Sequence, residues 1–403
     1  MNINKITSRE TSILKALSIL IIVLHNSLHP FFPQTIDGGN EFNFEIIRIQ
    51  TFIYEVGANI WSMPNMLLAT FGYCAVFLFF FLSSYGLTTK YGDTIEAPYW
   101  SFIGQRVTKI LLPILLISVF MLLFLIAGGN QFGSLHDITA SGFLFRLSMF
   151  SNFSFDQTWT VIGPWWFLST IIQFYLIFHA MNWGYKRFGG WFYVVISVVS
   201  IAVLFFLNAP LYDGEIIALR ATVLGWLPEI SLGCYFARSE KIEIGHAKAV
   251  ILALLFLSLF LLGSIFEPLW VFSSMAVLLF MIIISRPVLN IIERSEPLTR
   301  YLIYTGNISV YMFLLNGIIR EPFVHNESLE YWQQSILAIA LLAANFVISA
   351  GMLALQNRSL SLIEHAYHRL NKGAEAVKSK VSSELVAVVI LGVVVVVELF
   401  YIG

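Results

Sequence analysis

The sequence predicts an all-α fold, a bundle of membrane-spanning helices, from its composition and its apolar runs. Hydrophobic residues make up 58% of the chain and charged residues only 12%, with a mean hydropathy of +0.79. Soluble domains carry about 25% charged residues, so a soluble globule is excluded. The net charge of −1, with no basic block, gives no indication of nucleic-acid binding.

Apolar runs of about 20 residues, the length that crosses a bilayer as a helix, recur ten times. The sixth run is the weakest, because Arg220 and Glu229 interrupt it. The ten predicted spans are 11–29, 66–88, 108–128, 164–181, 190–208, 216–236, 248–265, 269–285, 302–320 and 335–356.

A polar, helix-prone stretch follows the tenth span, and residues 386–402 form one more apolar run. We therefore predict three parts. They are a ten-helix membrane domain over 1–356, a polar cytoplasmic connector over 357–383, and an eleventh transmembrane helix within 384–403.

The distribution of lysine and arginine predicts the orientation in the membrane. With the N-terminus inside, most of these residues fall on the inner side, which is the usual bias of cytoplasmic loops. The outer side then keeps only Arg48, Arg146, Arg220 and Arg320. We expect a cytoplasmic N-terminus, which places the end of the first span on the outer side.

Two histidines, His25 and His29, close that first span and are the leading candidates for chemistry. They are one helical turn apart and share a face. Ionisable groups at membrane depth are costly and indicate a functional site, and histidine exchanges protons near neutral pH. His25 is expected to act as a general base. For His29, beside Pro30, a hydrogen-bonding role at the headgroup boundary is an equal alternative.

Residues around this pair favour acid–base chemistry over a metal site. Zinc needs three or four ligands, and no further ligand pattern accompanies the two histidines, so no metal is expected. Glu41 is a possible partner for His25, since a carboxylate bonded to one ring nitrogen orients an imidazole and raises its basicity.

A second group of candidates lies on the predicted cytoplasmic side. Arg106 and Lys109 are three residues apart, so a helix presents both cations together. With Arg9 and Lys15 from the first span, they could receive a phosphate-rich ligand. The alternative is ordinary anchoring by positive charges on the inner side.

Embedded charges and aromatic outer loops complete the pattern. Arg220 and Arg320 must pair or face a water-filled cavity. The outer loops 30–65 and 129–163 are rich in aromatic residues, which suit sugar rings or, equally, form an interfacial aromatic belt.

Several stretches, taken in order, resemble the acyltransferase-3 family of membrane-bound acyltransferases, many of which O-acylate bacterial surface glycans. The likeness covers about residues 5–356. The matching stretches are Lys15 to His25, Gly72 to Gly86, Arg106 with Lys109 and Pro113, Gly163 to Phe178, Leu227 to Arg238, and Thr305 to Asn316.

The chain departs from the family pattern at two positions. The usual spacing from the basic residue in the first helix leads to Asn26, one residue after His25. Asn316 stands where a histidine is common.

The resemblance implies an acyl-CoA-dependent O-acyltransferase of the bacterial inner membrane. It would move an acyl group, most simply acetyl, from cytoplasmic acyl-CoA to a hydroxyl of an extracytoplasmic or lipid-linked glycan. His25 would act as the base or carry the acyl group, with Glu41 beside it. Arg106 and Lys109, with Arg9 and Lys15, would bind the CoA phosphates. The expected substrate-binding residues are His29, Asn26, Arg220, Trp166, Asn316 and Arg320.

Two other classes of protein fit the same residues. A multipass transporter of a lipid-linked sugar or another polar solute would also embed histidine and arginine. A sensing or scaffolding protein derived from the enzyme would keep the bundle without turnover. Dependence on acyl-CoA separates the enzyme from both.

Overall fold

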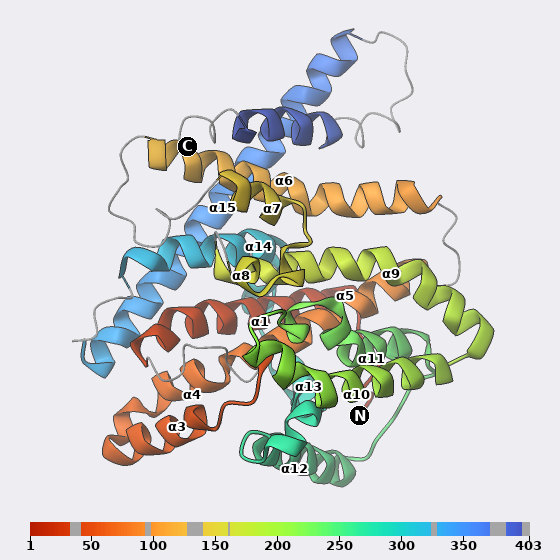
Figure 1. Cartoon of the computed structure of the whole chain (residues 1–403), viewed down its shortest axis with the longest axis vertical. Coiled ribbons are helices and arrows are strands. Elements are labelled where there is room, and N and C mark those ends of the chain that lie inside the picture. The colour runs from red at the N-terminus through yellow and green to blue at the C-terminus, as the bar shows by residue number, and fades with distance from the viewer. Residues whose placement is uncertain are drawn as a thin grey trace.

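The computed structural model describes residues 1–32, 42–92, 98–126, 140–159, 162–323, 329–370 and 384–396. Within these ranges the chain is mostly helical and forms no strand, which confirms the predicted all-α class (Figure 1). Eight helical segments in this part are long and apolar enough to cross a membrane. The chain is therefore a multi-pass membrane protein.

Helices occupy nine of the ten predicted spans, and the sixth is α-helical only in its second half. α9 is long but carries more polar residues, and α11 is short, so these two are absent from the eight long apolar segments. The helices of the bundle are α1 (Ser8–Leu28), α4 (Met63–Phe71) with α5 (Ala75–Tyr91), α6 (Tyr99–Ile126), α9 (Trp166–Phe188), α10 (Trp191–Asp213), α11 (Leu227–Arg238), α12 (His246–Gly263), α13 (Glu267–Ile292), α14 (Glu296–Arg320) and α15 (Tyr331–Leu370).

Short elements fill the connections between these helices. They are η1 (His29–Phe31), α3 (Ile46–Ala58), η3 (Ile60–Ser62), η4 (Gly72–Cys74), α7 (Ala140–Leu147), η6 (Ser151–Phe153), α8 (Phe155–Thr158), η7 (Gly163–Trp165), η8 (Leu219–Ala221), η9 (Val223–Trp226) and η10 (Glu321–Phe323). The η elements are 3₁₀ turns. η4 joins α4 to α5 and faces the end of α1.

The first helix begins at a capping box and ends at Leu28, and Pro30 lies in the 3₁₀ turn that follows. The Glu10 backbone N–H donates to the Thr7 hydroxyl, and the Thr7 N–H donates to the Glu10 carboxylate at 2.6 Å, which satisfies two helix-end donors. Glu10 also pairs with Arg286 of α13 at 2.8 Å. The start of α1 is therefore tied to the bundle.

α1 and α14 run parallel and in close contact. A Cβ on Gly306 would lie 2.2 Å from the Ser12 carbonyl oxygen. Fourteen residues further along both helices, Arg320 donates to the carbonyl of Asn26. Glycine permits this approach, as small residues do between membrane helices. The pairing brings Arg320 to the end of α1 that carries the histidines.

The sixth predicted span is wrong as a single helix. Residues 216–236 form the turns η8 and η9 and then the short helix α11. Arg220 is buried, donates to the Gly225 carbonyl and pairs with Glu229 at 3.3 Å, while the Trp226 indole donates to the Arg220 carbonyl. A buried ion pair needs hydrogen-bond partners for its remaining donors. Here the backbone turns around the guanidinium and supplies them, which a continuous helix would prevent.

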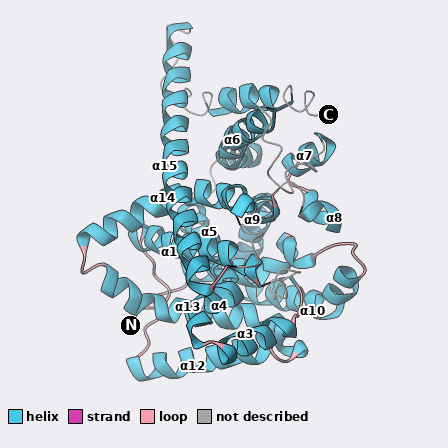
Figure 2. Cartoon of the chain, turned by 90° about the vertical axis from the view of Figure 1, so that its left-hand side faces the viewer, coloured by secondary structure: helices cyan, strands magenta, loops and turns pink. Residues whose placement is uncertain are grey.

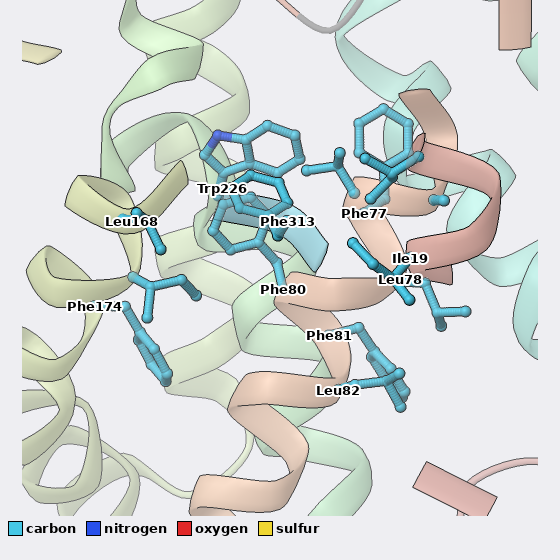
Figure 3. Close-up of a cluster of buried hydrophobic side chains, with 14 of the residues drawn as sticks. Ile19, Phe77, Leu78, Phe80, Phe81, Leu82, Leu168, Phe174, Trp226 and Phe313 are labelled. Atoms are coloured by element: carbon cyan, nitrogen blue, oxygen red, sulfur yellow. The ribbon is translucent and has the colours of Figure 1, made fainter. Parts of the chain in front are cut away.

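The centre of the bundle is a cluster of aromatic side chains (Figure 3). The Trp226 ring stacks on Phe80 with centroids 4.2 Å apart, and Trp166 stacks on Trp226 at 5.6 Å. Ser84 is buried where α11 meets α5, since a Cβ on Gly233 would lie 2.0 Å from its hydroxyl. Packing between helices accounts for the buried positions of Ser84 and Trp166.

The helix α15 extends beyond the tenth predicted span into the helix-prone connector. α15 continues to Leu370, so the first half of the connector predicted over 357–383 is helix, and α15 stands out beyond the rest of the bundle (Figure 2). An apolar helix, Glu384–Val396, lies near α6 and α15. Its 13 described residues span about 20 Å, short of the roughly 30 Å hydrocarbon core, and residues 397–403 lie outside the described part.

Candidate functional site

His25 lies in the last turn of α1 and is buried, with 6% of its surface exposed. Its Nδ1 lies 3.0 Å from the backbone carbonyl oxygen of Leu68 in α4. A carbonyl only accepts hydrogen bonds, so Nδ1 carries the proton in this contact. In the neutral ring, Nε2 is then the nitrogen with a free lone pair, which is the form that a general base requires.

Gly72 and Tyr73 of η4 hold the other side of the His25 ring. A Cβ on Gly72 would lie 2.5 Å from the Cβ of His25, so only glycine fits at this position without movement. The centroid of the Tyr73 ring is 6.3 Å from that of His25. The 3₁₀ turn between α4 and α5 therefore fixes where the imidazole lies.

The second histidine, His29, is held by an arginine. The two histidine rings have centroids 5.0 Å apart, and Arg320 donates from Nη1 to Nε2 of His29 at 3.2 Å. Arg320 also donates to the Asn26 carbonyl. The structure thus brings together His25, His29, Arg320 and the backbone of Asn26, four of the residues that the sequence singled out.

Arg48, in α3, belongs to the same cluster and was not predicted as a site residue. Its side chain is buried, with 3% exposed. It donates to the carbonyl of Ala69 at 3.4 Å and lies over the Tyr73 ring at 5.2 Å. The available signal was a lone arginine between isoleucines in an otherwise apolar stretch, but only the fold shows that this stretch packs against α4, which itself packs against α1.

The predicted phosphate-binding cations do not form one compact group. Arg106 of α6 lies over the rings of Tyr91 of α5 (4.8 Å) and Phe102 of α6 (5.7 Å), and Lys109 is exposed one turn further on. Arg9 forms an exposed ion pair with Glu296 at 2.9 Å.

Lys15 is partly buried in the first half of α1. No hydrogen bond or ion pair between described residues joins Arg9 or Lys15 to the α6 pair. Arg106 and Lys109 remain available to a ligand at one end of the bundle.

Among the remaining predicted substrate-binding residues, Arg220 and Trp166 lie apart from the histidines, and Asn316 lies one helical turn before Arg320. Arg220 and Trp166 belong to the aromatic core, which reaches His25 through the rings of Tyr73, Phe77 and Trp226. Asn316 is one turn before Arg320 in α14, and its amide donates to the Phe313 carbonyl at 3.0 Å. Its buried side-chain oxygen has no partner among the described residues.

Glu41, the predicted partner of His25, lies outside the described residues. Over the described ranges, no group of three or more histidine, cysteine, aspartate or glutamate side chains could hold a metal ion. The orientation of His25 in this structure comes from a backbone carbonyl.

The fold and this cluster define the class, a multi-pass α-helical membrane protein with a buried histidine–arginine cluster at one end of its first helix. Residues 11–355 match the family model Acyl_transf_3, described as an acyltransferase domain. The chain therefore belongs to the acyltransferase-3 family and is a membrane acyltransferase. It matches no curated protein and no solved structure.

Proposed function

We propose that this acyltransferase moves an acyl group, most simply acetyl, from cytoplasmic acyl-CoA to a hydroxyl of an extracytoplasmic or lipid-linked glycan. The observation that carries the proposal is the state of His25. It is a buried imidazole at the end of a membrane helix, with Nδ1 bonded to a backbone carbonyl and Nε2 left as the basic nitrogen.

The direction of transfer rests on the charge bias of the sequence. The lysine and arginine bias supports a cytoplasmic N-terminus, in a protein that we propose to lie in the bacterial inner membrane. Ser8 and His25 are then separated by about 25 Å along α1, so His25 lies near the outer face. The pantetheine arm of the donor would enter from the cytoplasm, and Arg106 and Lys109 would bind the CoA phosphates.

In the proposed reaction, Nε2 of His25 accepts the proton of the acceptor hydroxyl as its oxygen attacks the thioester carbonyl carbon. The tetrahedral intermediate collapses by breaking the carbon–sulfur bond, and the protonated imidazole returns the proton to the leaving thiolate. The products are the O-acyl ester and free CoA. A two-step variant, in which Nε2 first accepts the acyl group and then passes it to the hydroxyl, uses the same residue.

The test measures ester-linked acyl groups on the surface glycans of cells in which the chain is deleted and then restored. Wild type should restore acylation. His25→Ala and His25→Gln should fail by ~10²-fold or more, the usual contribution of a general base, at equal membrane abundance.

His365→Ala is the matched control, since His365 is exposed on α15 away from the cluster. It should restore acylation fully. Rescue by His25→Ala would remove His25 as the base, and unchanged acylation in every strain would overturn the proposed function.

A further inference from the structure

The histidine cluster contains two arginines whose positive charge is only partly balanced. Arg48 is 3% exposed and Arg320 is partly buried. Neither forms an ion pair with any residue that the structure describes. Burying a guanidinium without a counter-charge is unfavourable, so a buried arginine without an ion pair indicates a functional role.

The hydrogen bonds of the two arginines account for part of their donors. Arg48 reaches the carbonyl of Ala69 at the end of α4, and Arg320 reaches Asn26 and His29 at the end of α1. The carbonyls of Ala69 and Asn26 lie at the C-terminal, negative ends of their helices, which is a modestly stabilising position for a cation. In each guanidinium the buried Nε has no partner in the described part of the chain.

Both arginines lie beside the proposed base. Leu68 and Ala69, adjacent in α4, accept hydrogen bonds from His25 and Arg48 respectively. The Tyr73 ring contacts both residues, and His29 links His25 to Arg320. Glu321 acts electrostatically on Arg320, but no described carboxylate forms an ion pair with either guanidinium.

We propose that the acyl acceptor is an acidic sugar, whose carboxylate or phosphate group binds between Arg48 and Arg320 and so brings a hydroxyl to His25. This inference rests on the proposed function and names its acceptor class. Guanidinium groups bind carboxylates and phosphates through paired N–H donors. A neutral sugar would leave both guanidinium groups without an ion-pair partner among the described residues, so the cluster discriminates against it.

The proposal is tested first by binding, without turnover. Purified wild-type protein in nanodiscs is titrated with methyl glucuronide, glucose 1-phosphate and methyl glucoside, and the melting temperature is recorded. We expect at least one acidic probe to raise the melting temperature and the neutral glucoside to leave it unchanged. The acidic probe with the stronger effect shows whether the site prefers a carboxylate or a phosphate. Equal responses to all three probes would overturn the proposal.

Variants assign the effect to the two arginines. Arg48→Met and Arg320→Met should each lower the apparent affinity for the acidic probe, obtained from the melting-temperature titration, at least tenfold. Arg48→Lys, which keeps the charge but not the planar fork, should fall between these variants and wild type. Arg300→Met is the control, since Arg300 is exposed at the other end of α14. Retained binding in both methionine variants would contradict the assignment.

Turnover separates this inference from the proposed function. With acetyl-CoA as donor, the ratio of kcat/KM for the acidic over the neutral acceptor should exceed ten in wild type and fall toward one in Arg48→Met. Acyl transfer with no preference for acidic acceptors would overturn the acceptor class and leave the proposed function standing. Selective binding of acidic sugars without any acyl transfer would overturn the function instead.

Discussion

Gly72 lies directly against His25, with space at its α-carbon for a hydrogen and nothing larger. A Cβ at this position would lie 2.5 Å from the Cβ of His25 and 3.3 Å from its Nδ1. The 3₁₀ turn that links α4 to α5 therefore sets the position of the buried imidazole, through a residue that has no chemistry of its own.

The first prediction follows from this contact. Gly72→Ala should push the His25 ring away from the Leu68 carbonyl and lower kcat/KM at least tenfold, since small displacements of a catalytic group can cost about 10²-fold. Acyl-transfer assays on the purified variant check this. Gly86→Ala, in α5 with nothing within 4 Å of the added methyl, is the control and should keep full activity. Wild-type activity in Gly72→Ala would show that the turn does not position His25.

The second prediction concerns the contact between α1 and α14. Gly306→Ala would place a methyl group 2.2 Å from the Ser12 carbonyl oxygen and force the two helices apart. Overpacking of this kind costs about 1–3 kcal/mol, so the melting temperature should fall by several degrees, and acyl transfer should fall with it because Arg320 would move away from His29. Gly351→Ala, in α15 with open space around it, should leave both quantities unchanged. Equal melting temperatures for the two variants would contradict a close α1–α14 contact.

The third prediction concerns the buried pair of Arg220 and Glu229, whose side chains are 3% and 0% exposed. Glu229→Gln should destabilise the protein by about 3–5 kcal/mol, because the guanidinium would stay buried without its carboxylate. Thermal unfolding in detergent measures this. Arg300→Ala, which breaks the exposed pair with Glu296, should have little effect, since exposed pairs contribute little. A stable Glu229→Gln variant would mean that the carbonyl and aromatic contacts of Arg220 are sufficient.

The fourth prediction tests the donor site. Replacing both Arg106 and Lys109 with alanine should raise KM for acetyl-CoA at least tenfold and change kcat much less, because the lost contacts hold the phosphates and not the reacting carbon. In wild type, added salt should raise the same KM by screening the exposed Lys109.

A double alanine variant of Lys186 and Arg187 is the control for the donor site. These two exposed cations lie at the end of α9, on the same predicted side of the membrane. An equal rise in KM in both double variants would indicate general charge attraction and not a defined site.

Much of the helix arrangement could be predicted because apolar run length reports directly on membrane crossing. The prediction was wrong at residues 216–236, where hydropathy suggested one helix and the chain forms two turns and α11. Arg220 and Glu229 were visible as interruptions, yet their pairing across nine residues depends on how the backbone turns. Helix ends also differed, as in α6, which begins at Tyr99 and encloses Arg106 and Lys109 in its interior.

The candidate site could be predicted in part. His25 and His29 follow from one helical face, and their clustering with Arg320 needed the parallel packing of α1 on α14. Arg48 was missed because no sequence pattern shows that α3 packs against α4, the helix whose carbonyls hold His25 and Arg48. Trp166 and Arg220 were expected near substrate, and they lie in the aromatic core.

The sequence by itself determined that this protein is a helical membrane bundle and where its first helix carries ionisable groups. Both follow from local properties, hydropathy and helical periodicity, which need no knowledge of neighbours. Only the tertiary structure decided which nitrogen of His25 stays basic and which arginines surround it. Those features depend on the carbonyls of Leu68 and Ala69 and on Gly72. These residues have no reactive side chain, and their role comes entirely from where the packed helices place them.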